Sequence, residues 1–299
     1  MCNTKQGRIS DRMKDEKLDI SIDQMSQDEV RTLAQWACSE GWNPGKADIE
    51  LAWAFDPQAF IAMHRGDELI AAGTILSYGG QFGFMGLFIV RADLRGQGLG
   101  TQLWHHRRDR LLARLQPDAA IGMDGVFDMV PFYTKGGFQL AWRDLRFEGI
   151  AHGHQDAQAI DLRSIPFEQV DRLDRRYFAC SRAPFLQNWI RQPGGQALGL
   201  IEAGELVAYG VVRPAQAGFK IGPVFARRAD LAERLLGALL AKVEGQTVQL
   251  DVPEINEAAL RLAVRFGLAE SFGCARMYHG AAPRIEVSGV FGVTSFEFG

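Results

Sequence analysis

Cysteine is scarce in this chain of 299 residues, which contains only four, namely Cys2, Cys38, Cys180 and Cys274. No two of them form a C-x-x-C pair, so neither a disulfide framework nor a zinc site is expected. Unpaired, reduced thiols are typical of the cytoplasm, where we expect this protein to work. His152 and His154 form an H-x-H pattern in a polar connector, and a solvated linker explains it better than a metal site. We therefore expect no metal.

Long apolar runs and a strong excess of one charge are missing as well. No segment approaches the about 20 consecutive apolar residues that a membrane helix needs. The formal net charge of −3 argues against nucleic acid or an anionic membrane as the main partner. Residues 1–17 are polar and charged and lack the apolar centre of a signal peptide, so we interpret them as a flexible leader. The length and the 47% of hydrophobic residues suit two globular domains.

The first half carries a regular order of apolar patterns and turn signals. They predict a strand, two helices, three strands, a helix, a strand, a short helix and a closing strand, at residues 18–22, 26–40, 47–55, 60–64, 69–76, 84–90, 101–115, 119–123, 131–135 and 139–147. Ser26 with Glu29 three residues later is typical of a capping box at a helix start. This mixture favours an α+β sandwich over a doubly wound parallel sheet.

The second half repeats that order in a weaker form. Its predicted elements lie at residues 159–162, 167–178, 198–212, 219–225, 229–243, 248–252, 254–266, 275–279 and 289–298, and the third of them is a hairpin. Such a repeat indicates an internal duplication, with domains at 18–150 and 159–299 and a linker at 151–158. The first half is one strand short after Phe147. The last strand, 289–298, either pairs within its own domain or crosses to the first, and we favour its own domain.

The most specific signal is a glycine-rich loop between an apolar strand and a helix. Gly96, Gly98 and Gly100 alternate directly before the helix predicted at 101–115. Glycines leave backbone N–H groups accessible, and the helix adds the positive end of its dipole, so the loop suits a phosphate. It matches neither G-x-G-x-x-G nor a P-loop. A tight turn without a ligand is the alternative.

Two motifs in the correct order resemble the GNAT acetyltransferases. The first is Arg95-x-x-Gly98-x-Gly100, and the second is Tyr133-x-x-x-Gly137-Phe138, one strand later. Segments 41–45, 123–126, 275–278 and 294–297 are similar to a bacterial two-domain type whose C-terminal half is itself GNAT-like. The resemblance implies two tandem domains, each a mixed, mostly antiparallel sheet flanked by helices.

The resemblance also implies acetyl-CoA as co-substrate and an amine as acceptor. The pyrophosphate would bind to the loop residues Arg95, Gly96, Gln97, Gly98, Leu99, Gly100 and Thr101. The backbone of the preceding strand, at Phe88, Ile89 and Val90, would pair with the pantetheine arm. One of its N–H groups would polarise the thioester carbonyl as an oxyanion-type donor.

Proton transfer requires an acid and a base, because an alkylamine with a pKa of about 10.4 is mostly protonated at neutral pH. Tyr133 matches the position of the acid that protonates the CoA thiolate, with core packing as the alternative. Asp124 is the best base, and a turn carboxylate that caps Gly125 and Val126 is the equal alternative. Glu50 and Glu297 are weaker candidates for the base.

Two further groups of residues have predicted contacts. Trp42, Asn43 and Trp53 are expected to wall the acceptor pocket, with core packing as the alternative. Four arginines follow the glycine loop, namely Arg107, Arg108, Arg110 and Arg114. For most of them a solvated helix face is favoured over contact with the CoA 3′-phosphate.

The second half lacks both motifs. No glycine lies in residues 226–232, and Ala263 stands where the tyrosine would be, so this domain is expected to have lost acetyl-CoA chemistry. The leading hypothesis is an N-acetyltransferase for a small-molecule primary amine, as a monomer or homodimer. A protein lysine or N-terminal acetyltransferase, a longer acyl donor, and a non-catalytic acyl-CoA-binding regulator are the alternatives.

Overall fold

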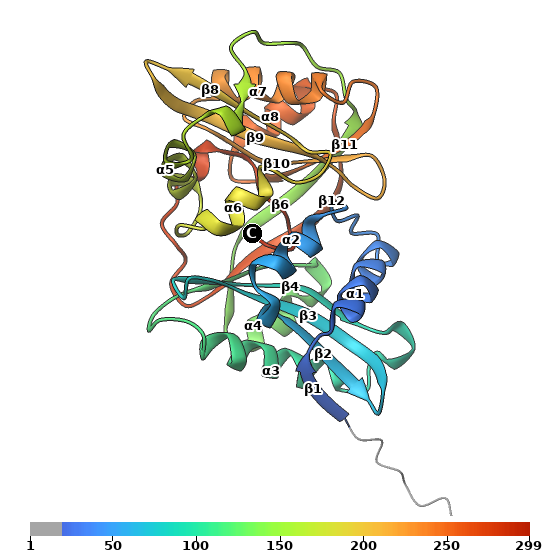
Figure 1. The fold of residues 1–299 in the computed structure, drawn as a ribbon. Coiled ribbons are helices and arrows are strands. Elements are labelled where there is room, and N and C mark those ends of the chain that lie inside the picture. Colours follow the sequence, from blue (N-terminus) through green and yellow to red (C-terminus); the bar gives the residue numbers. More distant parts are fainter. Residues whose placement is uncertain (1–19) are drawn as a thin grey trace, which may run out of the picture.

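The computed structural model describes residues 20–299 (Figure 1). The predicted leader, 1–17, lies outside the described residues. The elements of the first half are β1 Ile20–Gln24, α1 Gln27–Ser39, α2 Asp48–Phe55, β2 Phe60–Arg65, β3 Glu68–Tyr78, β4 Phe82–Val90, α3 Leu99–Leu112, β5 Ile121–Gly125, α4 Val130–Lys135 and β6 Phe138–Ile150. They confirm the predicted order of strands and helices from 20 to 150.

The second half repeats the order, as predicted, with one additional helix. Its elements are β7 Ile160–Asp161, α5 Phe167–Tyr177, α6 Ala183–Trp189, β8 Gln196–Glu202, β9 Glu205–Pro214, β10 Phe219–Ala226, α7 Ala229–Ala241, β11 Thr247–Pro253, α8 Glu257–Arg265, β12 Ala269–His279 and β13 Val290–Gly292. Helix α6 was not predicted, because seven residues are too few to display a helical period. The α+β class is confirmed.

Local chemistry explains how the first helix starts. The side chain of Ser26 accepts from the Glu29 amide at 3.4 Å, and the Glu29 carboxylate accepts from the Ser26 amide at 2.6 Å. This is the predicted capping box, which satisfies two backbone donors that the helix itself cannot pair. The helix then buries Val30, Leu33 and Ala37 against the sheet.

One continuous sheet joins the two halves. Its strand order is β1-β2-β3-β4-β5-β12-β6-β11-β10-β9-β8-β7, and β13 pairs with β10 off this path. Strand β12 of the second half therefore lies between β5 and β6 of the first half, with Met277 opposite Met123 of β5. It supplies the strand that the first half lacks. The predicted division places residues 275–279 in the second domain, whereas this strand pairs with β5 and β6 of the first half, so the division is corrected at this strand.

The C-terminal strand belongs to its own domain, as favoured, but it is much shorter than 289–298. Val290–Gly292 pairs with β10, and the Val293 amide donates to Asp251 of β11 at 2.8 Å. The segment then crosses to the first half. There the Phe298 carbonyl accepts from the Tyr78 hydroxyl at 2.7 Å. A Cβ on Gly86 of β4 would lie 2.1 Å from the Glu297 carbonyl oxygen.

The parallel strand pair in each half separates after a few residues. In the first half β4 pairs with β5 only at Gly83 and Phe84. In the second half β10 pairs with β11 only from Phe219 to Ile221, and β13 occupies the gap that follows. The two halves thus share one architecture, but the C-terminal strand fills the separation in the second half.

Side chains from both halves form a common core. The ring of Phe55 lies 5.6 Å from that of Phe185, and the ring of Tyr78 lies 5.1 Å from that of Phe178. A fully buried ion pair joins Asp48 of α2 to Arg213 of β9 at 2.8 Å. Figure 1 shows the C-terminus between the halves, close to α2 and α6. No helix within residues 20–299 is long and apolar enough to cross a membrane.

Candidate active site

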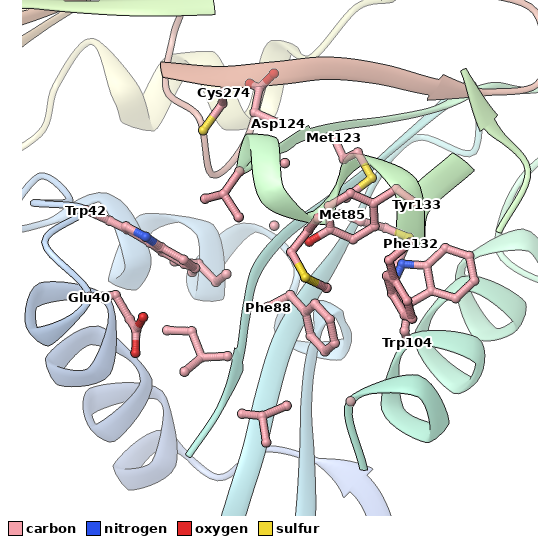
Figure 2. A pocket seen from close by; sticks show the side chains of 18 of the residues that line it. Glu40, Trp42, Met85, Phe88, Trp104, Met123, Asp124, Phe132, Tyr133 and Cys274 are labelled. Atoms are coloured by element: carbon pink, nitrogen blue, oxygen red, sulfur yellow. The ribbon is translucent and has the colours of Figure 1, made fainter. Parts of the chain in front are cut away.

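A cavity of about 640 Å³ opens where β4 and β5 separate. Figure 2 shows Trp42 and Glu40 on one side of it, and Phe88, Trp104 and Phe132 on the other. Its lining includes Met85, Gly86, Leu87, Phe88, Ile89, Val90, Arg95, Gly96, Gly98, Gly100, Thr101, Arg107, Asp124 and Tyr133. Most residues that were predicted to contact the cofactor therefore lie around one cavity.

A bulge in β4 shapes the floor of this cavity. Ala72 pairs with Ile89 and Thr74 pairs with Gly86, so two residues of β4 face one residue of β3. Leu87 within the bulge has a φ of +48°. A bulge bends the strand and leaves backbone groups unpaired, which makes them available as donors at the cavity.

Arg107 of α3 lies beneath the bulge. Its Nη2 donates to the carbonyl oxygens of Thr74 at 2.6 Å and Gly86 at 2.8 Å. A Cβ on Gly73 would lie 2.5 Å from the Arg107 Cζ, so the glycine makes room for the guanidinium. Burial without a carboxylate partner among residues 20–299 lowers the pKa of Arg107 to about 9. The side chain holds the bulge in place by two charge-assisted hydrogen bonds.

A solvated helix face was predicted for most of the four arginines of this helix, and Arg107 is an exception because it is buried. Leu99, Leu103, Arg107 and Leu111 follow each other at four-residue spacing, and all four are buried. The predicted buried stripe contained only the leucines of this helix. The spacing of Arg107 from the leucines was the signal that would have placed it inside.

The glycine loop has the geometry of an anion site. Gly96 and Gly98 have φ values of +80° and +81°, and a Cβ on either would meet no atom within 4 Å. Gly98 caps α3, and the first bond into the helix runs from the Gln102 amide to the Gly98 carbonyl at 3.2 Å. Within the described chain none of the amides of residues 96–101 donates to another group. These free donors at a helix N-terminus fit a pyrophosphate.

Arg95 positions the loop. Its Nε donates to the Val90 carbonyl at 2.9 Å, and its Nη2 pairs with Glu40 at the end of α1. Gly100 lets the helix approach β4, because a Cβ there would lie 3.3 Å from the Val90 side chain. These contacts indicate that Arg95 fixes the position of the loop.

Tyr133 lies in the cavity wall at α4. A Cβ on Gly125 of β5 would lie 2.4 Å from the Tyr133 Cε2, so the glycine creates the space for the phenol ring. Figure 2 shows the phenol beside Met85. Burial raises the pKa of Tyr133 to about 12, although the Arg107 charge acts in the opposite direction. The hydroxyl is therefore protonated at neutral pH and available as an acid.

Asp124 is held in a buried ion pair. Its two carboxylate oxygens accept from Arg276 Nε at 2.6 Å and Nη2 at 2.7 Å. Arg276 also lies 3.3 Å from Asp144, so one guanidinium serves two carboxyls. Burial raises the pKa of both carboxyls, and that of Asp144 more strongly. The side chain of Asp124 neither caps the following turn nor stands free in the cavity.

The three predicted acceptor residues separate in the structure. Trp42 lines the cavity. Asn43 instead connects the halves, because its side chain exchanges hydrogen bonds with the Ala217 backbone at 3.0 and 2.9 Å. Trp53 packs edge-on against Phe60 with ring centroids 5.3 Å apart, which is the core packing considered as its alternative. Neither belongs to the cavity lining.

The C-terminal half contributes a wall that the sequence analysis missed, apart from Glu297 as a weak candidate for the base. Its residues in the lining are Phe272, Cys274, Phe296 and Glu297. Next to them lies Arg146 of β6, with its guanidinium 4.8 Å from the Phe296 ring centroid. Burial raises the pKa of the Cys274 thiol, which makes it a poor nucleophile. No local sequence signal indicates that these residues reach the first domain.

The corresponding loop of the second half has no such site. Helix α7 starts at Arg228 in an extended conformation, and this arginine pairs with Glu202 and Asp230 at 2.9 Å each. Both carboxylates add negative charge beside the start of α7, which disfavours an anion there, and β13 fills the gap between β10 and β11. Among residues 20–299 no group of three His, Cys, Asp or Glu side chains is arranged to hold a metal ion.

Comparison with known proteins agrees with this geometry. The model of the acetyltransferase (GNAT) family matches residues 27–138, and that of an acetyltransferase (GNAT) domain matches residues 170–292. The holothin acyltransferase of Pseudoalteromonas is 24% identical over 278 residues, 92% of each chain. An uncharacterized N-acetyltransferase of Bacillus subtilis is 24% identical over 237 residues, 77% of this chain and 80% of that one.

Solved structures share the fold. A putative acetyltransferase from Pyrococcus horikoshii superposes with a TM-score of 0.81 at 20% identity over 97% of this chain and all of that one. A tandem GNAT protein from the clavulanic acid biosynthesis pathway gives 0.61 at 16% identity, over 89% of this chain and all of that one. Fold, cavity and relatives define an acyltransferase. The chain belongs to the GNAT superfamily and carries two domains of that family in tandem.

Proposed function

We propose that this enzyme transfers an acyl group, with acetyl as the simplest case, from acyl-CoA to the primary amine of a small molecule. The observation that carries the proposal is the row of free amides at residues 96–101, which leads along separated strand β4 to Tyr133. A relative over most of the chain is named holothin acyltransferase, which supports acyl transfer to a defined acceptor. Aromatic walls at Trp42, Phe272 and Phe296 suit a compact acceptor better than a polypeptide.

The residues around the cavity would have separate roles in binding and in proton transfer. The amides of residues 96–101 hold the pyrophosphate, and the unpaired edge of β4 pairs with the pantetheine arm. Bound acyl-CoA supplies a thioester that the acceptor nitrogen attacks. Backbone amides at the bulge, held by Arg107, are donors for the carbonyl oxygen. Tyr133 gives its hydroxyl proton to the leaving sulfur.

The base is a separate question. Asp124 was the leading candidate, and it would act as a base only after it separates from Arg276, because both of its oxygens accept from that guanidinium. Breaking a buried ion pair of this kind costs about 3–5 kcal/mol. Another carboxylate at the cavity is therefore a better candidate for the base.

The test is thiol release from acetyl-CoA and longer acyl-CoA donors with a panel of amines. The panel contains polyamines, amino acids, amino sugars, aromatic amines and a lysine-containing peptide. We expect release with at least one small amine and a lower rate with the peptide. Tight acyl-CoA binding without release for any amine would instead favour the non-catalytic regulator. Faster release with the peptide would favour a protein acetyltransferase.

A further inference from the structure

Glu297 of the C-terminal segment lies at the reactive end of the cavity. It belongs to the cavity lining, and its backbone packs directly on Gly86, the residue that precedes the β4 bulge. The segment is anchored on both sides of it. Val293 is bonded to Asp251 of β11, and the Phe298 carbonyl is bonded to Tyr78 of β3. The second domain thus places one carboxylate beside the active site of the first.

One oxygen of this carboxylate lacks a partner. The residue is only 3% exposed, and its Oε2 has no hydrogen-bond donor among residues 20–299. Its Oε1 lies 3.8 Å from the Nζ of Lys220, which is an ion-pair distance too long for a hydrogen bond. A buried carboxylate oxygen without a donor is costly, so a carboxylate in this state within a cavity lining calls for a donor from a ligand.

The neighbouring charged groups do not supply that donor. Arg146 is bonded to both oxygens of Asp251 at 2.7 and 2.9 Å. Lys220 lies 3.8 Å from Asp251 as well as from Glu297, and burial lowers the pKa of its ammonium. Two cations therefore face two carboxylates, and Glu297 is the carboxylate with the weaker contacts. A cationic group that enters the cavity would find its partner there.

We infer that Glu297 binds the ammonium group of the acceptor and takes its proton, so that the acceptor class is a cationic alkylamine. This inference rests on the proposed function. The ammonium gives one proton to Glu297, and the neutral nitrogen forms the new C–N bond while the C–S bond breaks. The leaving sulfur takes the Tyr133 proton. The second proton of the nitrogen returns to the phenolate, and Glu297 releases its proton to solvent.

The test compares Glu297→Gln with wild type on two matched acceptors. One is an alkylamine, cationic at pH 7, and the other is an aromatic amine, neutral at pH 7. For the alkylamine we expect kcat/KM to fall by a factor of about 10² or more, within the range of general base catalysis. For the aromatic amine the change should be much smaller. With the alkylamine, the difference in kcat/KM between wild type and variant should become smaller towards pH 10, where a larger fraction of the amine is already neutral.

Two variants separate this function from a structural one. Glu297→Asp keeps the carboxylate and should retain part of the alkylamine activity. Glu286 is an exposed carboxylate that precedes the same segment and pairs with Arg176. Glu286→Gln should leave kcat/KM unchanged with both acceptors. Acetyl-CoA affinity should be equal in all variants.

Three results would overturn the inference. The first is an unchanged kcat/KM of Glu297→Gln with the alkylamine. The second is an equal loss of kcat/KM with both amines. The third is a weakened acetyl-CoA affinity that by itself explains the loss of activity. A wild-type enzyme that releases no thiol with any amine would be a different failure. It would overturn the proposed function, and this inference with it.

Discussion

The guanidinium of Arg107 donates to the Gly86 carbonyl at 2.8 Å, and so links helix α3 to the bulge of β4. The second domain contains a parallel to this contact, because Arg213 Nη1 donates to the Gly222 carbonyl of β10 at 3.1 Å. The two arginines differ in their charge partners. Arg213 is paired with Asp48, whereas within residues 20–299 no carboxylate pairs with Arg107. Of these two arginines, only Arg107 therefore has no carboxylate partner among the described residues, and it lies beneath the cavity.

Replacing Arg107 should damage catalysis through the backbone that it holds. We expect Arg107→Met to lower kcat about tenfold or more, because the bulge amides lose their position as donors. The free energy of unfolding of the variant should also be about 1–3 kcal/mol lower, since two buried carbonyls lose their donor. Arg107→Lys keeps a charge but not the planar fork, and should recover activity only in part. Steady-state kinetics and denaturant unfolding measure both effects.

The matched control for this prediction is Arg110→Met, on the same helix but outside the cavity lining. It should leave kcat unchanged. If Arg107→Met lost stability but kept full kcat, Arg107 would serve only the fold.

Tyr133→Phe should slow the chemical step without weakening donor binding. Loss of a general acid costs a factor of about 10² or more. Burial raises the Tyr133 pKa to about 12, so the hydroxyl stays protonated up to high pH. The wild-type rate should therefore show no decline from Tyr133 below about pH 10. Single-turnover kinetics against pH, together with acetyl-CoA titration, check both points, and an unchanged chemical rate in the variant would remove Tyr133 from the mechanism.

Gly98→Ala should weaken acetyl-CoA binding more than it weakens the fold. The substitution costs about 1–2 kcal/mol of backbone strain at φ +81°, and its methyl group extends into the open space of the anion site. Gly66→Ala is the control, because Gly66 has a φ of +59° in the β2–β3 turn and also faces open space. Both variants should lose similar stability by thermal unfolding. Only Gly98→Ala should raise the Kd for acetyl-CoA, and equal Kd values would argue against the loop as the cradle.

Local signals in the sequence predicted the parts of the site that local structure creates. The glycine loop, α3 and Tyr133 each depend on residues close together in the chain, and all of them lie around the cavity. Residue type alone could not place Trp53, because an aromatic side chain in this segment is equally compatible with a core position and with a pocket wall. In the structure it packs on Phe60.

The exchange of β12 between the halves had no such signal. A strand's alternating pattern fixes which face is buried, but it does not name the neighbouring strand. Residues 275–279 therefore read as a strand without showing that they pair with β5. The same holds for Glu297, whose position depends on a crossing of the chain between domains. Long-range pairing decided both outcomes.

The carboxyls Asp144 and Asp251 are both buried but should respond to pH with opposite signs. Burial raises the pKa of Asp144 well above its usual value, because Arg276 bonds Asp124 in preference. Its contribution to stability is then full below about pH 4 and is lost as pH rises through the raised pKa. Arg146 and Lys220 lower the pKa of Asp251, so its contribution is present above about pH 4 and is lost as pH falls.

Asparagine substitutions should expose this difference when urea unfolding is measured between about pH 3 and pH 8. Relative to wild type, Asp144→Asn should gain stability as pH rises, because the amide cannot acquire a buried charge. The amide oxygen can still accept from the Trp142 indole, as the Asp144 carboxyl does at 3.0 Å. Asp251→Asn leaves Arg146 without its partner and should lose about 3–5 kcal/mol at pH 7. That loss should narrow only below about pH 4, where pH falls towards the lowered pKa of Asp251. If the free energy of unfolding of the two variants, relative to wild type, changed with pH in the same way, Asp124 and Asp144 would both be ionised beside Arg276 at neutral pH.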